Sequence, residues 1–554
     1  MTAHPADPVA PSDRPHRREM PPASPASGLG TLLRLTLRLA RRRLIWWTLA
    51  VAVLVPSSVI AIQEAYPDQA ALDARAALLG NPSAVIMTGP AFAQDQYTPW
   101  AMVANELLLY VLLPAAILGV LLTVSLTRGE EEAGRLELLR SLPVGRSVPA
   151  LAAFAVVLLA ALLVGTATAG GLIAAGGAVP DSLAVGAAVG LTTLVFAAVA
   201  AVIAQVTEHA GTASGASLGV LALAFLVRGV GDVLDPQGSW LSWLSPLAWA
   251  QQTRVYVDLR WWPLLLCLGL TLLLGAVVAV LGRRRDLGAG LLAARSGRAT
   301  APALLLAPSG LVRRLLGRSL IAWGIGLFLF AVAFGSLASS LEDLAADMPE
   351  LTTYAPLDLD NLTTSFSAYL LMMLAIGPLA LAVWGILRLG AEEREGRLAA
   401  LLLSGTSRTA VVGGWVAVVL GASALLQMLL GLGLGLGVWT ATSETHWVGD
   451  LVLASLAYLP AIALAASVAL LLYGRRLRLA GLAWLLVGWC ALDTMLGTLL
   501  DLPDVVRGLN PLFHVPLVPD AEWEAGPAAA LLGVAVLLGA GGLLALRRRD
   551  LVAG

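Results

Sequence analysis

A short charged segment occurs twice in the chain with the same spacing. Two glutamates precede a Gly-Arg-Leu triplet, and another arginine follows ten residues after the leucine. Seven of seventeen aligned positions are identical at a constant shift of 262 residues. The first copy holds Glu130, Glu131, Gly134, Arg135, Leu136 and Arg146, and the second holds Glu392, Glu393, Gly396, Arg397, Leu398 and Arg408. Carboxylates and guanidinium groups at this spacing can pair along a short amphipathic helix. A solvated loop helix explains one copy, but the recurrence favours a functional contact.

Four ionisable residues stand inside long apolar runs. They are Glu106, Arg228, Asp232 and Asp493. A charge near the centre of a bilayer costs about 2.5–3.5 kcal/mol on insertion scales, so each is a candidate functional residue. Arg228 and Asp232 are four residues apart and could pair on one helix.

The residue types exclude several kinds of chemistry. The chain has 35 arginines and no lysine, whereas a standard P-loop needs a lysine on the nucleotide phosphates. The five histidines show no metal-ligand spacing, so we expect no metal site. The net charge of −1 argues against a nucleic-acid partner. We therefore expect no catalytic residues and no cofactor in this chain; any ATP and Mg²⁺ would be bound by another polypeptide.

Membrane-spanning helices must position these residues. Apolar residues make up 58% of the chain and charged residues only 13%, whereas soluble domains carry about 25% charged residues. The apolar residues gather in runs of about 20, which is the length that crosses a bilayer. We predict an all-α polytopic membrane protein with twelve transmembrane helices. They are expected near 44–62, 101–127, 148–176, 183–206, 212–234, 263–281, 319–341, 366–387, 409–440, 449–473, 479–500 and 526–546.

The arginines predict the orientation. With the N-terminus inside, 30 of the 34 arginines outside the spans fall on the inner side. The positive-inside rule then places both termini in the cytoplasm. The use of arginine without lysine is typical of GC-rich coding, as in actinobacteria, so we expect a bacterial cell membrane.

The chain divides into two halves of six spans. Besides the charged segment, Arg283-Arg284-Arg285-Asp286-Leu287 recurs at 547–551, and Leu244-Ser245-Pro246-Leu247 resembles 509–512. Six spans is an even number, so the repeats are parallel and pseudo-symmetric about an axis along the membrane normal. Residues 29–43 should form a basic amphipathic helix at the inner surface. The expected parts are a disordered tail 1–28, a first half 29–290, a cytoplasmic linker with an amphipathic helix 291–318, and a second half 319–554.

These features resemble the permeases of type-2 ABC exporters. More narrowly, the chain is similar to the fused twelve-span exporters of polyketide antibiotics, also called tetronasin-type permeases. The resemblance covers nearly the whole chain after residue 29 and is carried by EEEAGRLELL at 130–139, EEREGRLAAL at 392–401, and the basic helix before the first span.

The resemblance implies a division of labour between polypeptides. The segment after the second span of each half would be a coupling helix that docks on a separate ATPase subunit. The first-copy residues named above would contact one P-loop ATPase subunit, and the second-copy residues would contact the other. The implied substrate is a hydrophobic or amphipathic small molecule such as an antibiotic. The expected partners are therefore two ATPase subunits, the lipid bilayer and that substrate.

The fifth spans of such permeases lie near the central axis. Aligning the halves on Pro246 and Pro511 places Arg228 opposite Asp493. We predict an ion pair between Arg228 and Asp493 across the pseudo-twofold axis, lining or closing the translocation path, with Asp232 competing for the guanidinium. A local Arg228–Asp232 pair is the alternative.

Two other functions remain open. A secondary transporter of the major-facilitator type also has six plus six parallel spans, and intramembrane carboxylates could couple it to protons. However, the chain lacks a GxxxDRxGRR-like loop after the second span. A membrane-embedded enzyme would need clustered His, Asp or Cys in the spans, and the sequence has no such cluster.

Overall fold

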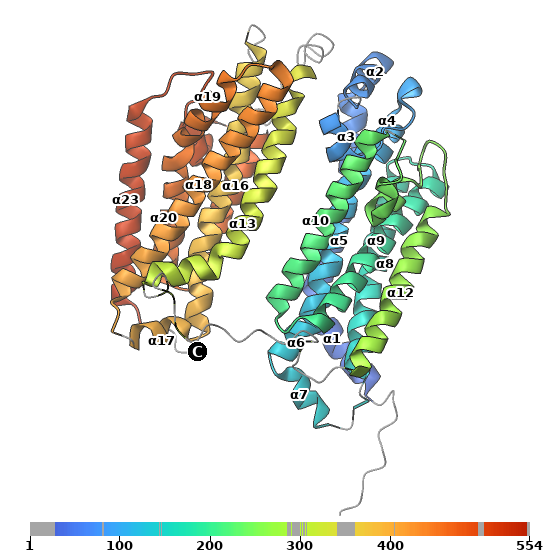
Figure 1. Ribbon diagram of the computed structural model, residues 1–554, viewed down its shortest axis with the longest axis horizontal. Helices are drawn as coiled ribbons and strands as arrows, with labels where there is room; N and C mark the ends of the chain where they lie inside the picture. The colour runs from blue at the N-terminus through green and yellow to red at the C-terminus, as the bar shows by residue number, and fades with distance from the viewer. Residues whose placement is uncertain are drawn as a thin grey trace, which may run out of the picture. The chain divides into compact units, whose positions relative to one another are not determined.

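The computed structural model describes most of the chain after residue 27. The described residues are 28–79, 82–142, 144–145, 147–235, 237–284, 290, 300, 302, 305, 307–340, 361–403, 405–496 and 503–550. Every regular element among them is a helix. They form two compact units, Met1–Ala65 with Pro99–Arg295, and Tyr66–Thr98 with Ser296–Gly554 (Figure 1). The segment Tyr66–Thr98, which follows α1 in the chain, therefore groups with the second unit.

The first unit is a bundle of six long apolar helices. Their bounds are α1 (Leu29–Ala65), α5 (Leu108–Leu126), α8 (Val148–Ala174), α9 (Val179–Val206), α10 (Ala210–Leu234) and α12 (Pro263–Arg284). Helix α4 (Pro99–Met102) and the π-helix η2 (Val103–Leu107) extend α5 at its start. Each of the six is long and apolar enough to cross a membrane. A helix rises 1.5 Å per residue, so about 20 residues span the roughly 30 Å of hydrocarbon.

The second unit contains five further candidate spans. They are formed by α13 (Pro308–Gly335), α16 (Leu362–Arg394), α18 (Arg408–Thr442), α19 (His446–Ser455) continued by α20 (Leu459–Arg475), and α23 (Ala525–Arg548). The chain is thus a multi-pass membrane protein. Of the expected span at 479–500, the described part is the shorter helix α21 (Ala483–Leu496). Residues 497–502 lie outside the described residues, so the count of twelve stays a prediction.

The helices differ in extent from the apolar runs that predict them. The basic stretch 29–43 continues into the first span as one unbroken helix, α1. Helix α13 starts at Pro308, inside the predicted linker, and its first turns lie at an angle to the rest (Figure 1). The glycine-rich runs near 148–176 and 409–440 form continuous helices, α8 and α18.

Small residues let the helices approach closely. A Cβ atom added to Gly165 of α8 would lie 2.6 Å from the carbonyl oxygen of Gly186 on α9, and one added to Gly474 of α20 would lie 2.3 Å from that of Gly542 on α23. Lipid tails are as apolar as leucine, so burial of apolar surface does not hold such helices together. Close backbone packing takes its place.

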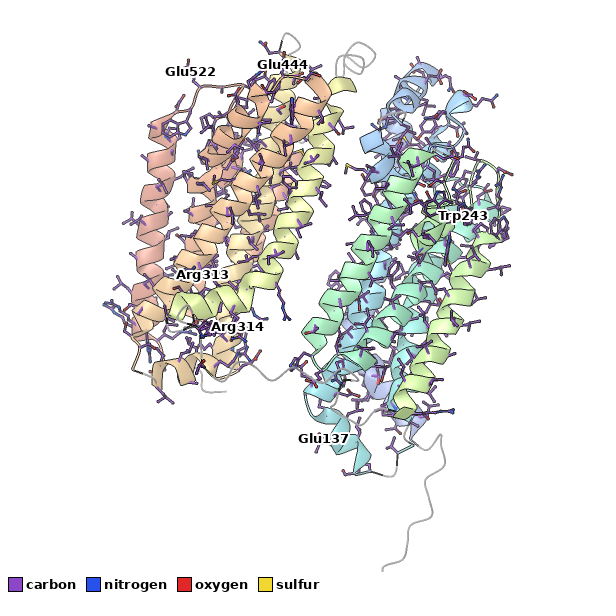
Figure 2. All side chains as sticks on the ribbon, viewed as in Figure 1. Glu137, Trp243, Arg313, Arg314, Glu444 and Glu522 are labelled. Atoms are coloured by element: carbon purple, nitrogen blue, oxygen red, sulfur yellow. The ribbon has the colours of Figure 1, made fainter. Side chains whose placement is uncertain are left out.

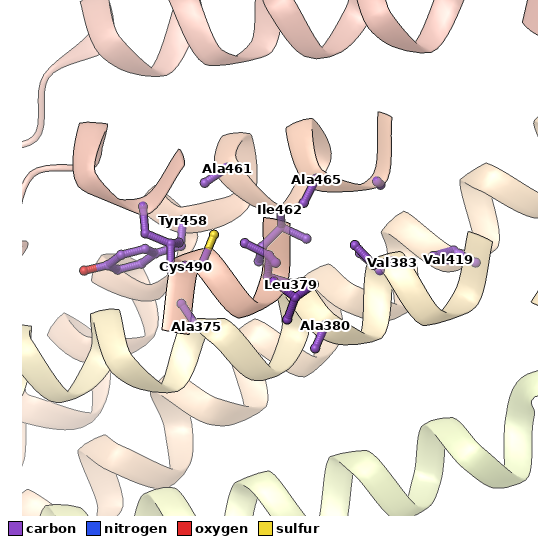
Figure 3. Close-up of a cluster of buried hydrophobic side chains, with 14 of the residues drawn as sticks. Ala375, Leu379, Ala380, Val383, Val419, Tyr458, Ala461, Ile462, Ala465 and Cys490 are labelled. Atoms are coloured by element: carbon purple, nitrogen blue, oxygen red, sulfur yellow. The ribbon is translucent and has the colours of Figure 1, made fainter. Parts of the chain in front are cut away.

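The core of the second unit lies between α16, α18, α20 and α21. Figure 3 shows Leu379 and Val383 of α16 beside Ile462 of α20 and Cys490 of α21. Each of these side chains is at most 2% exposed. This packing holds α16, at whose C-terminal end the second charged segment begins.

Candidate coupling segments and buried charge pairs

Each charged segment folds as two helices separated by a glycine. In the first copy, α6 (Arg128–Glu132) and α7 (Arg135–Arg140) flank Gly134, which has a φ of 71°. In the second, α16 and α17 (Arg397–Leu403) flank Gly396, with a φ of 73°. The expectation of a single amphipathic helix is therefore wrong. A left-handed residue ends the first helix, and glycine adopts that conformation without steric cost.

In each copy, an arginine of the second helix forms a two-pronged, hydrogen-bonded ion pair with a glutamate of the first helix. Arg135 donates from Nε to Glu130 Oε2 at 2.6 Å and from Nη2 to Oε1 at 2.8 Å. Arg397 grips Glu392 with the same pair of donors, and its Nη2–Oε1 distance is also 2.8 Å. The hydrogen bonds raise the pKa of both arginines. Arg135 and Arg397 are both exposed, whereas Glu392 is buried. The two parallel hydrogen bonds of each pair fix the orientation of the second helix relative to the first.

The second glutamate of the first copy, Glu131, belongs to a group of polar residues that joins α6 to the connection between α9 and α10. Glu131 pairs with Arg128, and Arg128 Nε also donates to the carbonyl oxygen of Glu208 at 2.8 Å. Glu132 accepts a hydrogen bond from the backbone N–H of Ala210 at 2.9 Å. The first segment is thereby held against the connection between α9 and α10.

The corresponding Glu393 is held by different partners. It accepts hydrogen bonds from Arg549 Nη2 at 2.6 Å and from the Tyr473 hydroxyl at 2.7 Å. Arg408 Nη1 donates to the carbonyl oxygen of Arg549 at 2.8 Å. Gly390 stands where the first copy has Arg128, and a Cβ there would lie 2.8 Å from Leu477. The second segment is thus held against the C-terminal end of α23.

Tyr473 and Arg549 were missed by reasoning from the sequence. The recurrence of Arg-Arg-Arg-Asp-Leu after the sixth span of each half could have pointed to Arg549. Arg146 and Arg285 lie outside the described residues, so their arrangement in the first half is not described.

The leucines of the two copies differ in burial. Leu136 is half-buried, whereas Leu398 is only 3% exposed and belongs to the core of the second unit. Leu138 on α7 and Leu403 on α17 are 71% and 89% exposed. Glu137 of α7 points outward at the end of the first bundle (Figure 2). Each second helix thus presents an exposed leucine to its surroundings.

The charged residues of the fifth spans have partners within their own units. Arg228 and Asp232 are fully buried, with 3.4 Å between Nη1 and Oδ2, and Asp232 accepts a hydrogen bond from Ser242 at 2.6 Å. Asp493 lies 3.2 Å from Arg507 Nε and accepts from Asn510 Nδ2 at 2.8 Å. Helix α10 is therefore fastened to the segment before α12, and α21 to the segment before α23. The cross-axis pair of Arg228 with Asp493 stays a prediction.

Glu106 lies in the π-helix η2 and is only 6% exposed. The neighbouring Asn105 is buried as well, at 1% exposure. Single-turn π-helices are frequent at functional sites, which makes this pair a further candidate.

Comparison with known proteins identifies the family. The family model described as multidrug efflux system permease Rv1217c, C-terminal domain, matches residues 29–284 and 305–547. The multidrug efflux system permease protein Rv1217c of Mycobacterium tuberculosis (strain ATCC 25618 / H37Rv) is 33% identical over 543 residues, covering 97% of this chain and 96% of the relative. The matched ranges include both charged segments and both fifth spans. The chain therefore belongs to the family of the multidrug efflux system permease Rv1217c.

Proposed function

We propose that the chain is the permease subunit of an ATP-driven ABC exporter. It would work with two copies of a separate P-loop ATPase, which bind ATP and Mg²⁺. The transported substrates would be hydrophobic or amphipathic small molecules such as antibiotics. The name of the relative, a multidrug efflux system permease, supports this substrate class.

The duplicated helix–glycine–helix segment carries the proposal. Both copies directly follow the second span of their half, and both use the same Arg–Glu grip and left-handed glycine. Their second helices present Leu138 and Leu403 to the surroundings. A buried apolar anchor with a polar rim is the usual anatomy of a protein interface.

Continuity of the backbone would convert docking into movement. α6 begins directly after α5 and the C-cap Thr127, and α17 follows α16 after two residues. Closure of the ATPase pair on bound ATP would push on α7 and α17. The ion pairs Arg135–Glu130 and Arg397–Glu392 would transmit this movement to the second span of each half. The bundle would then alternate between inward- and outward-facing states.

The two docking sites would not be equivalent. The first is fastened to the connection between α9 and α10 through Arg128 and Glu132, and the second to the end of α23 through Arg549. Fusion of the halves permits this divergence, because a homodimer of half-permeases would carry two identical sites.

A transport assay with the purified ATPase tests the proposal. Arg135→Ala and Arg397→Ala remove the grip at one site each, and we expect each to lower ATP-driven drug transport by about ten-fold, as for the loss of a charge-assisted hydrogen bond. Arg260→Ala is the matched control, because Arg260 also forms a surface pair, with Asp258, in the loop before α12. Its transport should equal that of the parent chain.

One structural observation favours the alternative function, a proton-coupled secondary transporter: Glu106 in η2 is buried. The two mechanisms separate in proteoliposomes that lack any ATPase. Full drug transport driven there by a proton gradient, and abolished by Glu106→Gln, would overturn the ATP-driven mechanism. Transport that requires both the ATPase and ATP would support it.

A further inference from the structure

A cavity of about 350 Å³ lies between α1 and α5. Helix α1 packs along α8 and only lightly against α5, which leaves a groove between them. Arg43 and Trp47 of α1 face Leu118, Leu121, Leu122 and Ser125 of α5 across it. The spacing of these residues, four apart on α1 and three or four apart on α5, places each set on one helix face.

The cavity is polar at one end and apolar along its length. Arg43 Nη1 donates a hydrogen bond to Ser125 Oγ at 2.7 Å, which uses one of the five N–H donors of the guanidinium. Leu118 lies seven residues before Ser125, so the apolar wall extends about 10 Å from the polar end along α5. Leu121 is 42% exposed and Trp46, next to Trp47, is 67% exposed. The groove therefore opens toward the surroundings of the bundle.

This arrangement fits one class of ligand. A guanidinium binds a phosphate oxygen pair in its planar fork, and tryptophan favours the boundary between headgroups and acyl chains. The leucine wall would contact an acyl chain that a free phosphate lacks. Arg42 is also exposed, but Arg43 is the arginine that lines the cavity.

We infer that this cavity binds an anionic phospholipid of the inner leaflet, with the headgroup phosphate on the remaining N–H groups of Arg43 and an acyl chain along Leu118, Leu121 and Leu122. Ser125, whose own hydroxyl donates to the carbonyl oxygen of Leu122 at 2.9 Å, would orient the guanidinium. The lipid would brace the last turns of α5, directly before the first charged segment. Binding itself is independent of the proposed export function, so it can be tested without transport.

Native mass spectrometry of the delipidated full-length chain tests the inference. The chain is titrated with phosphatidylglycerol or with phosphatidylcholine, and the retained lipids are counted. We expect phosphatidylglycerol to bind about ten-fold more tightly, and Arg43→Gln to remove this preference, as for the loss of a charge-assisted hydrogen bond. Arg42→Gln is the matched control: it removes the same charge from the neighbouring exposed position and should leave the preference unchanged.

A second variant keeps the charge and fills the space. Leu121→Trp should reduce retention of phosphatidylglycerol although Arg43 is intact. Equal losses in Arg43→Gln and Arg42→Gln would reduce the effect to the general charge of α1 and overturn the inference. Displacement of the lipid by equimolar inorganic phosphate would show that the site binds a small anion, and this would also overturn the inference.

Discussion

At the scale of residues, two glycines determine the shape of the charged segments. A Cβ at Gly134 or Gly396 would meet no atom within 4 Å, so the left-handed φ, and not a lack of space, requires glycine there. An L-residue other than asparagine or aspartate pays roughly 1–2 kcal/mol in that conformation. The direction of α7 and α17 therefore depends on one backbone angle each.

Substitution at these glycines should separate conformation from chemistry. Gly134→Ala should shift α7 away from its docking position, and we expect about a ten-fold loss of ATP-driven transport at a strain of roughly 1–2 kcal/mol. Gly134→Asn should retain most activity, because asparagine tolerates the left-handed region. Transport by the two purified variants with the ATPase is the measurement. Equal loss in both would show that the side-chain space matters instead.

The charged residues of α10 and α21 form ion pairs within their own units. Arg228 has Asp232 beside it and Asp493 has Arg507, each inside its own unit. Removing one partner of a fully buried pair such as Arg228–Asp232 typically costs about 3–5 kcal/mol, because the other charge stays buried. Arg507 is partly exposed, so Asp493 is the buried partner of the second pair.

Charge swaps discriminate between the local pairs and the cross-axis pair. We expect Asp493→Arg combined with Arg507→Asp to recover folding and transport better than Asp493→Arg alone, since the two side chains stay in contact. Asp493→Arg combined with Arg228→Asp should recover less. Thermal unfolding in detergent and drug transport are the readouts. Rescue by the second combination only would favour the pair across the axis over the local one.

At the scale of elements, close backbone contacts hold the spans. Gly165 and Gly186 pack α8 against α9 so closely that a Cβ on either would lie within 2.6 Å of the opposite carbonyl oxygen. Continuous helices such as α8 keep these contacts in register over their length. A larger side chain at the contact must push the two helices apart.

A pair of substitutions on one helix tests this packing. Gly165→Leu should lower the thermal unfolding midpoint in detergent by about 2–6 °C, because overpacking costs roughly 1–3 kcal/mol. Gly170→Leu is the control, since a side chain there meets no neighbour within 4 Å. A comparable destabilisation by both variants would mean that glycine is needed in α8 for another reason.

At the scale of the whole molecule, the charge distribution indicates an orientation. In the second unit, Arg313 and Arg314 lie at one end of the bundle, and Glu444 and Glu522 at the other (Figure 2). In the sequence, most arginines fall on the side of both termini. We therefore propose that both termini, α7 and α17 lie in the cytoplasm of a bacterial cell.

Cysteine labelling in intact cells checks this topology. Glu444→Cys and Glu522→Cys should react with a membrane-impermeant maleimide added outside, because both positions are exposed. Glu137→Cys and Arg314→Cys should react only after lysis. The parent chain, whose two cysteines are fully buried, is the unlabelled control. The opposite pattern would reverse the orientation and place α7 and α17 outside.

The sequence alone determined the membrane class, the apolar spans and the position of the duplicated segment, because hydrophobic run length and local repeats are properties of the chain itself. It also indicated that Arg135 can pair with the glutamates before it, but it did not select Glu130, which is five residues away, over Glu131. Only the tertiary structure decided that a left-handed glycine divides each segment, since Gly134 fits a helix by pattern. It also decided that Glu393 binds Arg549, which is 156 residues away, and that Asp493 binds Arg507. Such partners are chosen by how helices pack in three dimensions, and spacing along the chain does not encode that choice.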